Sequence, residues 1–594
     1  MVFIMKGLKK FFKTFKDVTP IALKPMLKKN SKDFWMTLIS SFLQSTFLGL
    51  NIIVQAKFFQ YVNEYINGGP VQTVALWMGI FFSFIIFQQI INAVVNFYIN
   101  KFIQSGYKVI ENNMMRKIKT LKPLYFEDPD NLLKLSRARA GAQDVILFLV
   151  LLIMSIAGYL PLFIIPTVYM AGKNASLALI FPLLLLPAIL AYFVKVKIFV
   201  KMRKEETQIT RVRDEYRKYI VGPAAKEMRM GGFYNFLYGK YKTGWEAVKS
   251  LKLKANLKIF IIETLLQLVS ASAYVGVIYL IVRATLLGDA DAGFLAATIG
   301  SMEFMFKMIE EFLTNFFQPI AERYSGIEFY LQLMNEPDQE IGKNLTDIEK
   351  ISVRNLSFKY PKAEDYAVKD VNLDLEKNKL LAIVGENGSG KSTLLKLILG
   401  LYDSGEGSIK FYDKMNQEII GPNLREKASA IFQDYYKYKM QLDENIEISD
   451  LNKNESYKGA LEKAGLSEEM AIFPQGGSTI LARDFHGVDL SGGQWQRVAI
   501  ARGVYRDRDI IAFDEPTAAI DPLEESALYN KLREISEGKI GLLITHRIGS
   551  ARIADEIVVM NGGKVSERGT HEELMERKGE YFSMVEAQAK WYEK

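Results

Sequence analysis

Nine consecutive residues, "GENGSGKST", carry the side chains best suited to chemistry in this sequence. They fit the pattern G-x-x-x-x-G-K-[ST], and they lie between an apolar run that predicts a strand and another that predicts a helix. The glycines permit a tight loop whose N–H groups, with the helix N-terminus, can surround phosphate oxygens. We therefore predict an ATP site built from Gly385, Glu386, Asn387, Gly388, Ser389, Gly390, Lys391, Ser392 and Thr393.

Two side chains of this loop have separate expected roles, and a second stretch supplies matching carboxylates. Lys391 would hold the β- and γ-phosphate oxygens, and Ser392 would ligate Mg²⁺. In "RDIIAFDEPT", four apolar residues predict a buried strand that ends at Asp514. We expect Asp514 to lie beside the Mg²⁺ and Glu515 to polarise the attacking water. An Asp-Glu pair alone is common, but after such a strand and phosphate loop it indicates ATP hydrolysis.

The stretch "VDLSGGQWQRVAIARG" is a second candidate for binding an anion. Ser491, Gly492 and Gly493 directly precede an amphipathic run, as in a helix whose N-terminal N–H groups are free to meet phosphate. Spacing alone does not say whose phosphate this segment would hold.

The first half of the chain has the composition of a membrane domain. A helix needs roughly 20 mainly apolar residues to cross a bilayer. Each such run could instead be a buried core helix, but their number favours a membrane domain. The six candidate spans are 34–56, 74–99, 145–170, 175–200, 258–285 and 293–318.

Basic residues predict the orientation of these spans. Segment 101–142 contains nine Lys and Arg residues and segment 201–257 contains fourteen, whereas "NEYINGGPVQ" and "LLGDADAG" contain none. Because cytoplasmic loops carry the positive excess, we expect a multi-pass protein of the cytoplasmic membrane with both long loops and both termini in the cytoplasm. The alternating Phe and Lys residues at the N-terminus predict an amphipathic helix on that membrane surface.

Polar residues inside the spans should face the bundle or a water-filled cavity, because they are costly against lipid. Hydrogen bonding between helices and lining of a transport pathway are both open alternatives. Glu303 has Lys307 one turn later, so a local ion pair is its plain alternative, and Met302, Met305 and Met308 could line a path or fill a core. The polar stripes are Gln44, Asn51 and Gln55; Gln88, Asn92, Asn96 and Asn100; and Glu263 with Gln267.

Composition excludes several kinds of site. The chain has no cysteine, which excludes disulfides, thiol nucleophiles and Cys-ligated zinc. Its three histidines are too scattered to predict a metal site. The net charge of +8 falls beside the apolar spans, where the positive-inside rule places it, so we expect no nucleic-acid partner.

The order of motifs in the second half resembles the nucleotide-binding domain of ABC transporters. The phosphate loop is followed by "IFQD", "LSGGQ", "IIAFDEP", "AAID" and "LLITHR". Six preceding spans with two long cytoplasmic loops resemble the exporter type, so the resemblance covers nearly the whole chain. It implies an α-helical membrane bundle of six transmembrane helices, followed by an α/β P-loop ABC ATPase domain.

The resemblance also implies roles for further residues. Tyr360 would stack on adenine, Gln433 would meet Mg²⁺ and the attacking water, and His546 would contact the γ-phosphate. A packed strand tyrosine and a structural histidine are the alternatives for the first and last. Asp521 matches the aspartate of the D-loop, although "AAID" lacks the usual small polar first residue. The implied catalytic set is Glu515, His546, Gln433 and Lys391, and the implied Mg²⁺ set is Ser392, Gln433 and Asp514.

In this family the signature residues Ser491, Gly492, Gly493 and Gln494 close over ATP held by the phosphate loop of another domain. One nucleotide-binding domain and six spans are half of the usual complement, so the resemblance implies a half-transporter that acts as a dimer. A homodimer is the simplest arrangement, and a heterodimer is the alternative. The expected parts are 1–32 (amphipathic segment), 33–325 (transmembrane domain), 326–350 (linker) and 351–594 (nucleotide-binding domain).

The stretch before the signature separates subgroups of the family. Many multidrug and lipid exporters carry a Thr-Glu-Val-Gly-Glu-Arg-Gly-like segment there, whereas this chain reads "TILARDFHGVDLSGGQWQ". Together with "FQDYYKYKMQLDENI" and Trp495, this resembles exporters of lantibiotic-type peptides, so a small peptide is the expected substrate. A multidrug or lipid exporter is the alternative. An ATP-gated channel is a further one, and six spans argue against a soluble ABC ATPase.

Overall fold

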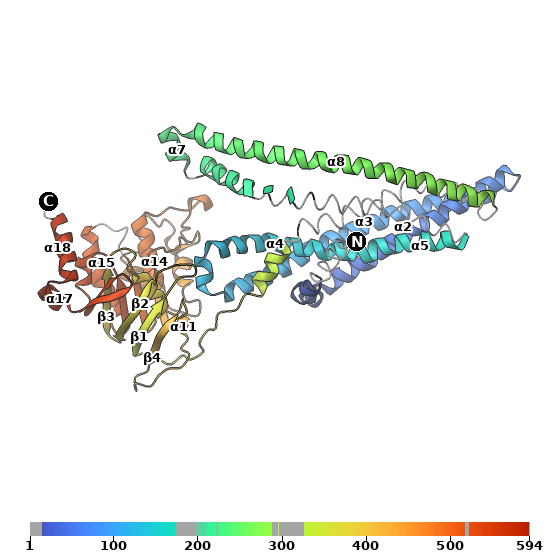
Figure 1. Ribbon diagram of the computed structural model, residues 1–594. Coiled ribbons are helices and arrows are strands. Elements are labelled where there is room, and N and C mark those ends of the chain that lie inside the picture. The colour runs from blue at the N-terminus through green and yellow to red at the C-terminus, as the bar shows by residue number, and fades with distance from the viewer. Residues whose placement is uncertain are drawn as a thin grey trace. The chain divides into compact units, whose positions relative to one another are not determined.

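A computed structural model of the chain describes residues 15–173, 198, 201–202, 205–206, 208–222, 224–287, 295, 323, 326–516 and 522–592 (Figure 1). The chain divides into two units. The helical unit comprises Met1–Thr120 and Asp130–Pro337, and the α/β unit comprises Leu121–Pro129 and Asp338–Lys594.

Long apolar helices make up the helical unit. The bounds are α2 Lys24–Ile66, α3 Val71–Thr120, α4 Pro129–Ile153, α5 Leu160–Lys173, α7 Ala225–Gly231 and α8 Tyr234–Leu286. π-Helical turns at Thr19–Leu23 and Met154–Tyr159 join the helices on either side of them. With 50 and 53 residues, α3 and α8 are about 75 and 80 Å long, which is far more than the ~30 Å core of a bilayer.

Three helices in the described part of the chain are long and apolar enough to cross a membrane: Phe15–Ile66, Val71–Thr120 and Pro129–Gly172. They contain the first three predicted spans, and α8 contains the fifth. Most of the spans 175–200 and 293–318 lies outside the described residues, as do Glu303, Lys307 and the three methionines near them. The side chains of Glu263 and Gln267 are also outside them.

The ends of the helical unit differ in detail from the expected boundaries. The first helix is bent at Asn30, whose φ and ψ (−132° and 39°) are not helical, close to the expected start of the membrane domain. The predicted linker 326–350 is helical over 326–334. Ile327, Tyr330 and Leu333 are buried there, because apolar residues at three-residue spacing share one face of a helix.

Small side chains allow close helix packing in this unit. Ser41, Ser45 and Gly49 recur every four residues along α2 and are buried. A Cβ on Gly49 would lie 3.0 Å from the Cβ of Ile165, and the Ser45 hydroxyl accepts a hydrogen bond from the N–H of Leu162 at 3.0 Å. Such close approach is how helices associate within lipid.

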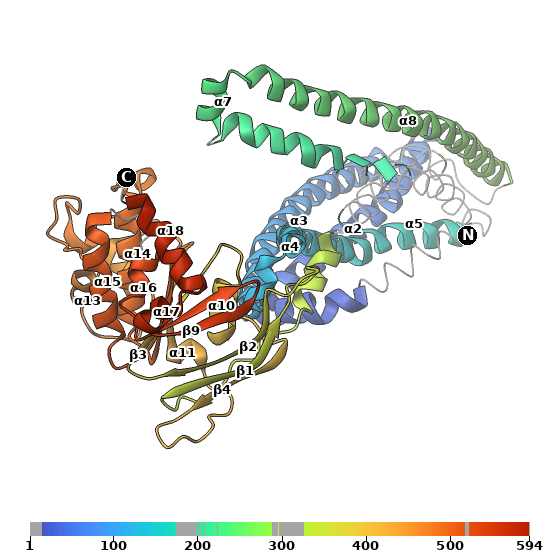
Figure 2. The ribbon, with the colours of Figure 1, turned by 60° about the vertical axis from the view of Figure 1, so that its left-hand side comes forward.

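The α/β unit contains two sheets (Figure 2). An antiparallel sheet has the order β2-β1-β4, and a larger one has the order β5-β6-β7-β3-β8-β9, parallel except for β9. β3, β6 and β7 are almost wholly buried apolar runs, as expected for parallel strands covered on both faces. The bounds are β1 Lys350–Phe358, β2 Val368–Glu376, β3 Lys379–Gly385, β4 Glu406–Tyr412, β5 Ala428–Ile431, β6 Ile510–Asp514, β7 Ile540–Ile544, β8 Glu556–Asn561 and β9 Lys564–Gly569.

The α/β unit also contains nine named α-helices in its described part, among them the helix after the phosphate loop and the helix that the signature residues begin. They are α10 Lys391–Ile398, α11 Leu424–Lys427, α12 Leu442–Glu447, α13 Lys458–Lys463, α14 Gly492–Arg506, α15 Pro522–Ser536, α16 Ile548–Ala551, α17 His571–Arg577 and α18 Glu580–Tyr592.

Residues 121–129, from the first long loop, belong to the α/β unit. Leu124 packs against the core of this unit, and Lys122 pairs with Asp403 at 2.6 Å. Glu127 accepts hydrogen bonds from Lys396 Nζ at 2.9 Å and from Tyr402 Oη at 2.7 Å. These two donors lower the pKa of Glu127, the tyrosine contributing most. This part of the first long loop is thus tied to α10, the helix that begins at Lys391.

Candidate ATP site

The predicted site residues come together because three parallel strands end at one edge of the larger sheet. β3 ends at Gly385, β6 ends at Asp514, and β7 leads into His546. β7 lies between the other two strands in the sheet. Ligands in open α/β sheets bind outside the carboxyl ends of the strands, so this edge is where nucleotide chemistry is expected.

Glycine is required at both ends of the phosphate loop. Gly385 and Gly390 have φ values of +148° and +100°, and a Cβ on either would collide with a backbone carbonyl, Met560 O or Ala367 O respectively. Between them, Glu386, Asn387 and Gly388 form an exposed tip. The loop therefore passes close to neighbouring backbone while presenting its N–H groups outward.

The polar groups inside the loop are buried and only partly satisfied. Lys391 is 6% exposed, and its Nζ donates to the carbonyls of Gly385 at 3.0 Å and Glu386 at 2.8 Å. Burial lowers its pKa, although the charges of Glu515 and Asp514 oppose the change. The Ser389 hydroxyl is buried and has no hydrogen-bond partner in the described structure. An ammonium and an unpaired hydroxyl in one loop suit a ligand rich in acceptors, such as phosphate.

Asp514 and Ser392 form an oxygen-rich pair suited to Mg²⁺. The Ser392 hydroxyl donates to Asp514 Oδ1 at 3.2 Å. Burial, opposed by this hydrogen bond, raises the pKa of Asp514 to about 6. A buried carboxylate that resists ionisation is stabilised by a nearby cation, and hydroxyl and carboxylate oxygens are ligands that Mg²⁺ prefers. These two residues fit the ion, which would neutralise charge on the β- and γ-phosphate oxygens.

Glu515 is held between two other residues of the predicted site. Its Oε2 accepts a hydrogen bond from Gln433 Nε2 at 2.8 Å, and its Oε1 lies 3.0 Å from His546 Nδ1. The Glu515 side chain is 11% exposed, and its backbone has φ +50°, a strained value for a residue other than glycine. The structure thus aims this carboxylate with two side chains and an unusual backbone conformation.

Tyr360 is anchored beside the loop by other aromatic rings. Its ring lies edge-on to Phe358 and Tyr402, with centroid distances of 5.3 and 5.9 Å. Its hydroxyl lies 3.1 Å from Thr393 Oγ1. A tyrosine fixed in this way, two residues beyond the end of β1, can offer a ring face to a base.

The signature residues start α14 with a complete cap. Ser491 Oγ accepts a hydrogen bond from the N–H of Gln494 at 3.3 Å, and Gln494 Oε1 accepts from the N–H of Ser491 at 2.9 Å. Ser491 and Gly492 are exposed, whereas Trp495 is 3% exposed. The helix is therefore anchored by its apolar face while its N-terminal N–H groups remain open to solvent.

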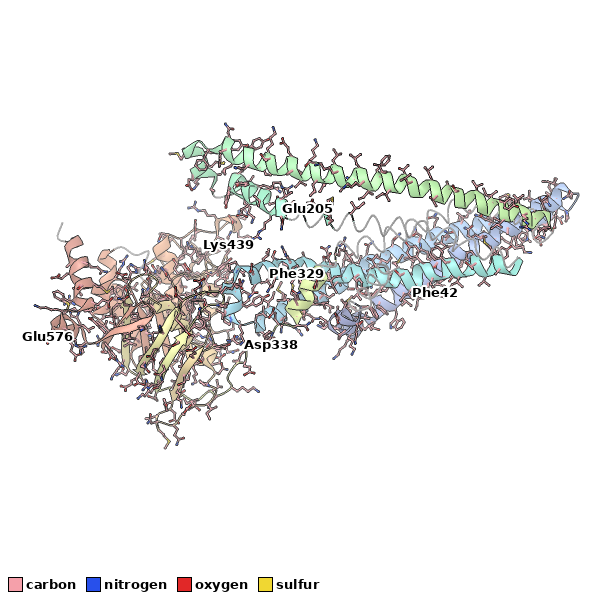
Figure 3. The ribbon with its side chains drawn as sticks, in the orientation of Figure 1. Phe42, Glu205, Phe329, Asp338, Lys439 and Glu576 are labelled. Carbon is pink, nitrogen blue, oxygen red and sulfur yellow. The ribbon has the colours of Figure 1, made fainter. Side chains whose placement is uncertain are left out.

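The two stretches that separate subgroups lie side by side. Leu481 donates its N–H to the carbonyl of Met440 at 3.0 Å. Lys439, labelled in Figure 3, pairs with Asp484. The structure joins the two stretches into one surface of the α/β unit.

Two contacts at the site were missed by the sequence reasoning. Tyr435 Oη donates to the carbonyl of Gly492 at 2.9 Å, which links the segment after Gln433 to the signature. Gln496 Nε2 donates to the carbonyl of Glu515 at 3.4 Å. Tyr435 follows Gln433 by two residues and Gln496 follows the signature by two, so proximity to a motif was the available signal. Asp521 lies outside the described residues.

Comparison with known proteins agrees with this geometry. A family model for the ABC transporter domain matches residues 368–518. The subtilin transport ATP-binding protein SpaT of Bacillus subtilis is 29% identical over 521 residues, covering 84% of this chain and 83% of that protein. A solved bacterial Atm1-family ABC exporter with ATP bound has a TM-score of 0.75 at 20% identity, covering 93% of this chain and 99% of that one. Residues 368–518 thus match the ABC transporter domain, and the chain has the fold of an ABC exporter.

Two other relatives match shorter parts of this chain. The nisin transport ATP-binding protein NisT of Lactococcus lactis subsp. lactis is 33% identical, covering 59% of this chain and 60% of that protein. The ATP-dependent lipid A-core flippase of Vibrio vulnificus is 30% identical, covering 61% and 64%. The chain thus spans less than two thirds of these two relatives. The ABC transporter domain and the exporter relatives support a membrane-embedded protein that binds nucleotide and hydrolyses ATP.

Proposed function

We propose that this exporter moves a small, lantibiotic-like peptide out of the cytoplasm by ATP-driven alternating access in a dimer. The observation that carries the proposal is the similarity to the subtilin transport protein over 84% of the chain. That length takes in both the helical and the α/β unit. The joined surface around Lys439 and Asp484, built from the two stretches with peptide-exporter character, adds support.

Hydrolysis follows from the groups around Glu515. In this proposal its carboxylate orients and deprotonates the attacking water, while Gln433 and His546 hold it in place. Lys391 would exchange its two carbonyl partners for phosphate oxygens when nucleotide binds. Ser392, Asp514 and Gln433 would hold Mg²⁺, and Tyr360 would stack on adenine.

The exposed signature helix supports a dimer. Ser491 and Gly492 lie at an open helix N-terminus that can meet the phosphate of ATP bound to a second copy. Two such copies, placed head to tail, would enclose two ATP molecules, with Asp521 near the shared boundary. A symmetric homodimer follows most simply, since each chain would then carry both halves of the site.

The membrane arrangement completes the proposal. In this proposal the chain has an amphipathic segment over 1–32, six spans within 33–325 and an ATPase domain over 351–594, with both termini in the cytoplasm. Closure of the ATPase domains would pull on the loop tips near 128–135 and 226–238. The bonds from Glu127 to α10 supply a physical link between the first loop and the phosphate-binding helix.

The test is ATP-dependent uptake into inside-out membrane vesicles that contain the full chain. Candidate peptides such as subtilin precursor are compared with lipophilic dyes and fluorescent lipids, and Glu515→Gln is the matched inactive control. Peptide uptake in the wild type alone supports the proposal. Transport of lipid without peptide would instead support the alternative that the similarity to lipid A flippases suggests.

A further inference from the structure

The exposed side of α3 divides into two flanks of different chemistry. Gln89, Asn92, Asn96 and Asn100 are all exposed, and we call them the amide flank. Ile86, Ile90, Val94 and Phe97 form an apolar flank, with exposed fractions of 63%, 54%, 40% and 62%. At 3.6 residues per turn, the two flanks are centred roughly 110° apart around the helix axis.

The polar stripe of α3 begins at the α2 contact and turns away from it. Asn51 Nδ2 donates to Gln88 Oε1 at 3.2 Å, and Gln44 Nε2 donates to Asn92 Oδ1 at 2.8 Å. Asn96 Nδ2 also reaches Asn92 Oδ1, at 3.4 Å. Hydrogen bonding between helices, one of the two sequence-based alternatives, therefore accounts for the first part of the polar stripe.

The rest of the stripe keeps unused hydrogen-bonding groups. Within the described residues, neither the Asn92 amide nitrogen nor the Asn100 side chain has a hydrogen-bond partner. Lipid tails can cover the apolar flank, but exposed amides in an apolar span require water or a polar partner. The amide flank is therefore the part of α3 that a polar occupant should cover.

The position of the flank indicates the side from which an occupant arrives. Asn100 is followed by Lys101, which pairs with Asp33 at 3.0 Å and marks the end of the apolar part of α3. From Asn92 to Asn100 the flank covers about 12 Å along the helix. It thus lies next to the basic segment 101–142, on the side proposed to be cytoplasmic.

We propose that the amide flank is a docking track for the backbone of an extended peptide that enters from the cytoplasm. This rests on the proposed function. Asn96 and Asn100 each offer a donor and an acceptor without charge, as a peptide group does, and Asn92 offers its amide nitrogen as a donor because its oxygen already accepts two hydrogen bonds. The amide flank repeats every four residues at Asn92, Asn96 and Asn100, which is about 6 Å along a helix. Peptide groups on one edge of an extended chain repeat every second residue, or every ~6.6 Å. The two repeats are close enough for three successive amides to meet successive peptide groups.

Single cysteines test this cleanly because the chain has none of its own. The comparison pairs Asn96→Cys with Val94→Cys, and Asn92→Cys with Ile90→Cys. In each pair the second position comes two residues earlier in the chain, so it lies on the apolar flank at nearly the same depth. The probe is a charged, water-soluble thiosulfonate reagent applied to inside-out vesicles. We expect the amide-flank cysteines to react at least tenfold faster. Subtilin precursor should slow their reaction at least tenfold, and a version N-methylated at alternate residues should not.

Several results would overturn the docking track. Equal reaction rates on the two flanks would show that the amide flank does not face water. A disulfide formed between two copies through Asn96→Cys would make the flank a contact between chains, and protection by lipid instead of peptide would make it a lipid site. Wild-type vesicles that fail to take up the peptide refute the proposed function itself. Uptake without protection refutes only the docking track.

Discussion

Replacing Asp514 by asparagine should stabilise the protein in the absence of nucleotide, even though the residue belongs to the ATP site. The Asp514 side chain lies at the end of β6 and is 4% exposed, and burial raises its pKa from 3.8 to about 6. The folded protein therefore keeps this proton to higher pH than the unfolded chain does. Stability should fall as the pH rises from about 4 to about 6 and remain lowered above that range.

The size of the effect follows from the two pKa values. Ionising Asp514 at pH 8 costs the folded state about 3 kcal/mol, and at pH 5 roughly half of that. Asp514→Asn keeps an oxygen for the Ser392 hydroxyl but carries no charge, so it should recover this energy. For a domain of this size the gain corresponds to about 6–12 °C in unfolding temperature at pH 8.

The assay is thermal unfolding of the purified full chain at pH 5 and pH 8, followed by tryptophan fluorescence. Buried Trp495 reports on the α/β unit. Asp374→Asn is the matched control. Burial acts to raise the pKa of Asp374, but hydrogen bonds from Arg354 and Ser352 keep that pKa low, so the loss of this carboxylate should destabilise the protein at pH 8. Adding Mg²⁺ and a non-hydrolysable nucleotide should stabilise the wild type more than Asp514→Asn.

The reasoning is refuted if Asp514→Asn is no more stable than the wild type at pH 8. It is also refuted if the gain does not increase between pH 5 and pH 8, since a gain independent of pH would come from packing and not from the buried charge.

Three further predictions concern single contacts. Tyr435→Phe removes the hydrogen bond to the Gly492 carbonyl, which is worth about 1 kcal/mol. It should lower ATPase activity severalfold without changing the binding of a fluorescent nucleotide. Unchanged ATP turnover would show that this hydrogen bond has no role in hydrolysis. Tyr402→Phe removes one donor to the Glu127 carboxylate and should cost about 1–2 kcal/mol of stability, seen as a lower unfolding temperature. Ser491→Arg, at an exposed helix start, should abolish hydrolysis while nucleotide binding persists; retained hydrolysis would argue against a shared site.

Much of the ATP site could be predicted from short stretches because its groups follow strand ends. The sequence placed Lys391 and Ser392 after one buried strand and Asp514 after another, and parallel strands bring such ends to one edge. The roles of Tyr360, Gln433 and His546 came only from family resemblance, since nothing in their own spacing indicates that Gln433 and His546 meet at Glu515. Their contacts depend on how loops fold over the sheet.

The helical unit was predictable for a different reason. Hydrophobic length predicts a span wherever about 20 apolar residues occur, independently of what the span contacts. Three described helices are long and apolar enough to cross a membrane and contain three of the six predicted spans, and a fourth predicted span lies within α8. Hydrophobicity does not determine helix bends, however, and it did not predict the change of direction at Asn30 or the helix over 326–334.

The sequence by itself determined the features that depend only on residues adjacent in the chain. A glycine-rich loop between strand and helix, a serine that caps the signature helix and a run of apolar residues long enough for a bilayer each depend on residues adjacent in the chain. The tertiary structure decided what depends on distant neighbours. It raised the pKa of Asp514 through burial, placed Gln433 and His546 on either side of Glu515, and attached residues 121–129 to the α/β unit. It also divided the amides of α3 into those bonded to α2 and those left exposed, because only packing determines which side of a helix is covered.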